Sequence, residues 1–157
     1  MGIVTENNNI PDFIAKMLEK REGKVRRGDY VIAIVVNIIL LYVFNNLLNW
    51  NIYFVTNALN GILWIINMAI IAIIILNLLQ IFYNPLWFRN LMKIFSNIFV
   101  FILVYFLYIV FPFSFNIIYV DIGLKFAFLI TLIVIFILTV IEVLLMLILI
   151  IKKLKVL

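Results

Sequence analysis

One acidic side chain, Glu142, lies deep inside a long apolar stretch and has the clearest capacity for chemistry in this sequence. No other charged residue occurs between Lys125 and Lys152. Glu142 precedes Lys152 by ten residues, which is about 15 Å along an α-helix. A carboxylate at that depth in a bilayer costs roughly 2.5 to 3.5 kcal/mol. We therefore expect Glu142 to be protonated, paired or in contact with water, as in an ion or proton site.

Four other polar residues are expected near the same depth. Each of the other apolar stretches brings one asparagine to within about 6 to 10 Å of its basic or aromatic flank, and no Lys or Arg is expected at the level of Glu142. These residues could form one hydrogen-bonded cluster at the axis of a helix bundle. The alternatives are amides that only join membrane helices, or a Glu142 that faces lipid or a partner. The candidate site residues are Glu142, Thr139, Asn37, Asn77 and Asn97.

The elements that must position these residues are membrane-spanning helices. The stretch from Tyr30 to Phe88 holds 59 residues without a single Asp, Glu, Lys, Arg or His. About 20 apolar residues cross a bilayer core as a helix, so this stretch predicts two crossings. Hydrophobic residues make up 68% of the chain, well above the share in soluble domains. Because lipid offers no hydrogen bonds to the backbone, helices are favoured throughout.

The predicted fold class is an all-α integral membrane protein, an antiparallel bundle of four transmembrane helices within residues 29–157. Trp87, Arg89 and Lys93 are expected to be surface anchors where the third helix begins, and Pro112 is expected to end that helix. The predicted spans are residues 30–49, 61–83, 90–111 and 124–151.

Residues 1–28 form a separate basic segment. Within it, apolar residues recur at helical spacing over about 10–22, which predicts an amphipathic helix lying on the membrane surface. A docking helix for a partner protein is the alternative. The residues expected to contact anionic lipid headgroups are Lys16, Lys20, Arg21, Lys24, Arg26 and Arg27.

The basic residues also predict the orientation. The N-terminal segment, the middle loop and the C-terminal tail carry eleven of the twelve Lys and Arg residues, and the second hairpin loop carries only Lys125. The positive-inside rule then places both termini in the cytoplasm of a multi-pass protein of the cell membrane. Because these charges flank apolar spans, the net charge of +5 indicates lipid rather than nucleic acid as the partner.

The sequence lacks the residues that most catalytic mechanisms require. The chain has no Cys and no His, and it lacks glycine-rich phosphate loops and nucleophile motifs. We expect no enzyme activity, cofactor or metal. The asparagines at 45, 46, 49, 51, 57 and 60 are expected to hydrate an interfacial loop or to line a vestibule.

The expected function is a non-enzymatic membrane protein, either a homo-oligomeric scaffold or an accessory subunit bound to another membrane protein. The alternative is a small cation or proton channel or transporter that uses Glu142 and the asparagine cluster.

Overall fold

Four long apolar helices form most of the part of the chain that the computed structural model describes, residues 27–155. They are α2 (Arg27–Asn46), α3 (Ala58–Phe82), α4 (Leu86–Val110) and α5 (Ile118–Lys155). All four are long and apolar enough to cross a membrane, α5 over Ile118–Ile148. The prediction of an all-helical fold with four helices long and apolar enough to cross a membrane is therefore confirmed.

The first 26 residues contain several sequence predictions that lie outside the described residues. These are the amphipathic helix at 10–22 and the headgroup contacts of Lys16, Lys20, Arg21, Lys24 and Arg26. Of the predicted headgroup contacts, Arg27 is described, and it is exposed at the start of α2.

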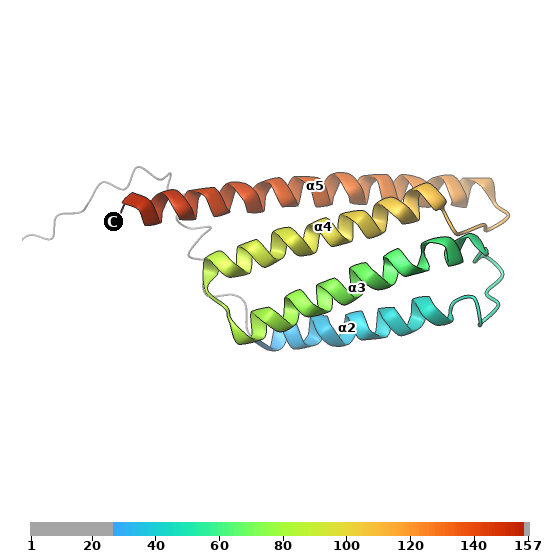
Figure 1. Ribbon diagram of the computed structural model, residues 1–157. Coiled ribbons are helices and arrows are strands. Elements are labelled where there is room, and N and C mark those ends of the chain that lie inside the picture. The colour runs from blue at the N-terminus through green and yellow to red at the C-terminus, as the bar shows by residue number, and fades with distance from the viewer. Residues whose placement is uncertain (1–26, 156–157) are drawn as a thin grey trace, which may run out of the picture.

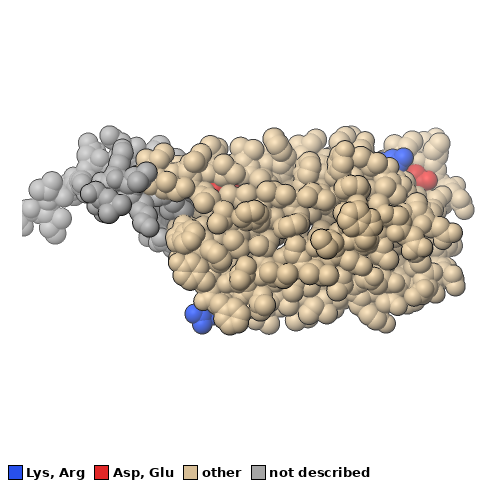
Figure 2. All heavy atoms as spheres, viewed as in Figure 1, with Lys and Arg blue, Asp and Glu red and all other residues tan. Residues whose placement is uncertain are grey.

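Consecutive helices run in opposite directions (Figure 1). The start of α2, the α3–α4 turn and the end of α5 lie at one end of the molecule, which we call the basic end because Arg27, Arg89 and Lys93 lie near it. The segments 47–57 and 111–117 lie at the other end, which we call the loop end. Charged atoms lie toward the two ends, and the face shown in Figure 2 is uncharged between them.

The helices pack as a row in chain order. α2 contacts α3, α3 contacts α4 and α4 contacts α5, and no other pair of described helices makes comparable contact. A closed four-helix bundle requires α2 to pack against α5, and these two described helices make no extensive contact. The antiparallel order was thus predicted correctly, but the helices do not enclose a common axis.

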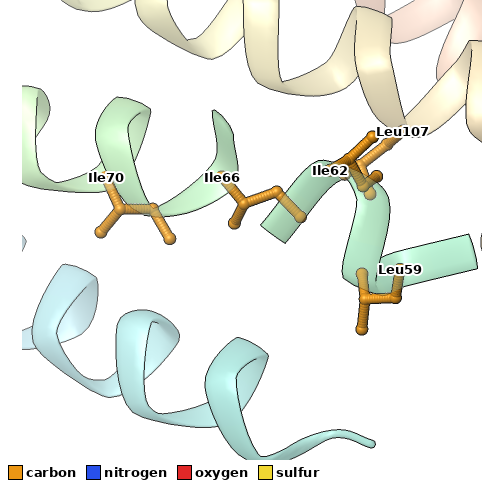
Figure 3. Close-up of a cluster of buried hydrophobic side chains, with 5 residues drawn as sticks. All are labelled: Leu59, Ile62, Ile66, Ile70 and Leu107. Carbon is orange, nitrogen blue, oxygen red and sulfur yellow. The ribbon is translucent and has the colours of Figure 1, made fainter. Parts of the chain in front are cut away.

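The core lies along α3, one of the two helices with neighbours on both sides. Leu59, Ile62, Ile66 and Ile70 recur at helical spacing and form a buried cluster with Leu107 of α4. Figure 3 shows Leu107 beside Ile62, close to the loop end of the cluster. This packing fixes α3 against α4, and side chains of α2 such as Leu41 and Phe44 cover the same cluster.

The two segments of the loop end are paired through their backbones. Thr56 donates its N–H to the carbonyl of Pro112 at 2.9 Å, and Ser114 donates to that of Phe54 at 2.8 Å. Phe54 also stacks on Phe115, with 4.7 Å between ring centroids. This clamp joins the α2–α3 hairpin to the α4–α5 hairpin, which places α3 and α4 in the middle of the row.

The fourth helix begins at Ile118, six residues before the predicted start at 124. Asp121 was expected in the loop, but it lies in the first turn of α5, where free backbone N–H groups favour a negative charge. Its carboxylate accepts the N–H of Phe115 at 3.1 Å. The loop is thereby tied to the helix, which extends over 38 residues, about 57 Å.

Candidate functional site

Glu142 is buried and lies on the stripe of α5 that packs against α4. Its side chain is 8% exposed. Among the α5 side chains whose burial the structure describes, the other buried residues are Leu132, Ile135 and Leu145, and together with Glu142 they recur at spacings of three and seven residues. Because α4 is the helix that α5 packs against, Glu142 faces protein rather than lipid.

The register of α4 and α5 shows what lies opposite Glu142. Leu132 and Ile135 cluster with Val104, and the Lys125 ammonium lies 4.7 Å from the centre of the Phe111 ring. The two helices are antiparallel, so a step of ten residues along α5 from Leu132 to Glu142 matches a step of ten residues back along α4 from Val104 to Ile94. Glu142 is therefore level with Ile94. Lys93 is therefore at the depth of the carboxyl group, which corrects the expectation that no cation lies there.

Lys93 and Asn97 also lie on the face of α4 that points to α5. They precede Val100 and Val104 by seven residues, close to two helical turns, and these two valines pack in the α4–α5 cluster. Both Lys93 and Glu142 have interaction partners. We call this part of the interface the polar seam: Asn90, Lys93 and Asn97 of α4 with Thr139 and Glu142 of α5.

Three predicted site residues, Asn97, Thr139 and Glu142, belong to the polar seam. The hydroxyl of Thr139 donates to the carbonyl of Ile135 at 2.7 Å, within α5. By the same register Thr139 is level with Asn97, so Asn97, Thr139 and Glu142 lie on facing stretches of α4 and α5. Their role as an ion or proton site stays a prediction.

The other two predicted site residues lie elsewhere. Asn37 donates to Ala33 at 2.7 Å and Asn77 donates to Ile73 at 2.8 Å, each within its own helix. α2 is at the far edge of the row, so α3 and α4 separate Asn37 from Glu142. The predicted cluster around one bundle axis therefore does not include Asn37.

Sequence reasoning missed three buried polar residues near the α3–α4 turn. Arg89, expected to be a surface anchor, is 4% exposed, whereas Trp87 is 45% exposed and fits that role. Gln80 and Asn90 are also buried. Nearby, the Tyr30 hydroxyl donates to Asn84 Oδ1 at 3.2 Å and connects α2 to the turn. One feature of the sequence could have identified Gln80 and Asn90, because both are polar residues near the ends of apolar helices.

A separate polar contact joins α2 and α3 nearer the loop end. Asn45 Nδ2 donates to Asn67 Oδ1 at 2.8 Å, and Asn67 Nδ2 donates to Asn45 Oδ1 at 3.0 Å. Asn45 therefore contacts a neighbouring helix as well as lying close to the loop.

We expect Asn45 and Asn67 to be coupled by about 1 kcal/mol, within the range measured for hydrogen-bonded pairs in membrane proteins. A double-mutant cycle with Asn45→Leu, Asn67→Leu and the double variant, followed by unfolding in mixed micelles, measures this coupling. Additive effects of the two substitutions would contradict the reciprocal pair.

Within residues 27–155, no group of three or more Asp, Glu, His or Cys residues is placed to hold a metal ion. Comparison of the chain with protein-family models, with curated proteins and with solved structures found no match.

Proposed function

We propose that this chain is a non-enzymatic, multi-pass protein of the cell membrane that acts as an oligomeric scaffold or as an accessory subunit of a membrane complex. The observation that carries this proposal is the open row of helices. Among the described helices, α2 packs mainly against α3 and α5 mainly against α4, so both edges of the row can accept another helix without rearrangement of the core.

The exposed side of α5 suits such packing. It is lined by branched apolar side chains, including Ile130, Ile133, Val134 and Ile137. In lipid, helices associate through close packing of complementary shapes rather than through exclusion of water. A long, continuous edge of this kind favours a helix from a second protein or a second copy.

In this proposal the basic end faces the cytoplasm, with both termini on that side. The count of Lys and Arg residues supports this orientation, because eleven of the twelve belong in sequence to the N-terminal segment, the middle loop and the C-terminal tail. The bilayer is the first partner, and anionic headgroups would bind the basic residues that precede Tyr30.

Cysteine crosslinking tests the oligomer directly, because the natural chain has no Cys. In native membranes, Ile133→Cys on the exposed side of α5 is expected to crosslink to a second copy or to one defined partner. Leu132→Cys, buried against α4, is the matched control and should not crosslink. A strict monomer in nanodiscs, with neither crosslink nor partner, would refute the proposal.

A cation or proton channel or transporter is the second candidate function. The buried Glu142 within the polar seam favours it, and Lys93 at the same depth disfavours cations there. If the carboxyl carries the flux, Glu142→Gln should reduce proton or cation flux into liposomes at least about a hundredfold, the lower end of the contribution of a positioned proton-transfer group. Asn77→Leu, whose amide bonds only its own helix, is the control. Equal flux in wild type and Glu142→Gln would exclude this role.

A further inference from the structure

The side-chain amide of Asn90 has no partner in the part of the chain that the structure describes. Asn90 lies in the second turn of α4 and is fully buried, yet neither its Oδ1 nor its Nδ2 is hydrogen-bonded. Gln80 Oε1, near the end of α3, is also buried without a partner. Amides in folded proteins are not normally left in this state, because each buried polar atom gives up hydrogen bonds to water.

The partner must both donate and accept hydrogen bonds. Asn90 Oδ1 needs a donor and Asn90 Nδ2 needs an acceptor. A metal ion could contact only the oxygen, and Arg89 and Lys93 on the same two turns of α4 oppose a cation. An anion could accept from Nδ2 but would leave Oδ1 without a donor. Water satisfies both atoms.

We propose that the polar seam between α4 and α5 binds water at Asn90. Asn90 precedes Asn97 by seven residues, so it lies on the same stripe of α4, toward the basic end. It is about 6 Å along the helix from the level of Glu142. Water held at Asn90 therefore continues the polar seam from the basic end toward the carboxyl group. This inference does not depend on the proposed function, because a scaffold and a transporter could both hold such water.

Water-edited solid-state NMR of the full chain in lipid bilayers tests the proposal. With asparagine side chains labelled with nitrogen-15, the Asn90 amide is expected to receive magnetisation from water as fast as the exposed Asn49, at least about three times faster than Asn77. Asn77 is the control because its amide is bonded to Ile73. Asn90→Leu assigns the signal. A transfer rate for Asn90 equal to that of Asn77 would overturn the proposal.

Thermal stability provides a second measurement if the signals overlap. If Asn90 holds water, Asn90→Leu removes satisfied hydrogen bonds and should lower the melting temperature by about 3 °C, the scale for a 1 kcal/mol change in a chain of this size. If the amide is dry and unpaired, leucine should raise the melting temperature, and this result would contradict the proposal. Asn77→Leu again serves as the control for the change of residue type.

Discussion

The Glu142→Lys variant is expected to lose about 3 to 5 kcal/mol of its free energy of unfolding, the cost of leaving buried charge without compensation. The carboxyl group is buried on the face of α5 that packs against α4, and the register places it near the level of Lys93. Lysine at position 142 would bring a second ammonium group to that level in a setting of low dielectric constant. Unfolding of the full chain in bicelles, or its yield in membranes, measures the loss.

Exchanging the two charges distinguishes the loss of an ion pair between Lys93 and Glu142 from a general disruption of α5. Lys93→Glu should be destabilising for the same reason, and the double variant Lys93→Glu with Glu142→Lys should recover at least half of the loss. Lys125→Glu, at the loop end and remote from the seam, is the control partner for Glu142→Lys. If the double variant is as unstable as the sum of its parts, Glu142 has another partner and the register argument fails.

The four helices could be predicted because lipid leaves the backbone no other arrangement. A stretch of 59 uncharged residues needs two crossings, and Pro85 and Pro112 separate the second half into two more helices. The structure ends α3 at Phe82 and α4 at Val110, close to those prolines. The start of α5 was predicted less well, because Asp121 resembles a loop residue until its bond to Phe115 is known.

The order of packing could not be predicted, because the helices carry no polar face to mark the outside. Ile65 and Ile66 of α3 are buried, whereas Ile71 and Ile75 of the same helix are exposed. In a soluble protein the exposed side of a helix carries polar residues and the buried side apolar ones, but in lipid both sides of the helix are apolar. The row is set instead by the backbone clamp between Thr56 and Pro112, a contact between two loops that no periodicity reveals.

Only part of the site could be predicted, because the sequence gives the depth of a residue but not the packing of its helix. The depth of Glu142 follows from its distance to Lys152, but its neighbours depend on how far α4 and α5 slide past one another. Lys93 was assigned to the membrane surface, whereas the register places it opposite the buried carboxyl. Asn37 lies on the predicted helix, but that helix does not pack against α5, since depth along a helix contains no information about which helices touch.

The core of α3 offers the second large expected effect. Ile66→Ala removes three carbon atoms from a side chain that is fully buried in the cluster of Leu59, Ile62, Ile70 and Leu107, and it should cost about 2 to 4 kcal/mol of unfolding free energy. The cost arises because neighbouring helices relax only partly into the space, so the lost contacts are not replaced.

Ile71→Ala is the matched control, on the same helix and with the same change of residue. Ile71 is 43% exposed, so lipid can fill the space that alanine leaves, and the expected effect is about 0.5 kcal/mol or less. Steric trapping in bicelles compares the two variants under identical conditions. Equal losses would mean that the buried cluster does not hold α3 against α4, whereas a loss confined to Ile66 would establish which side of α3 faces protein.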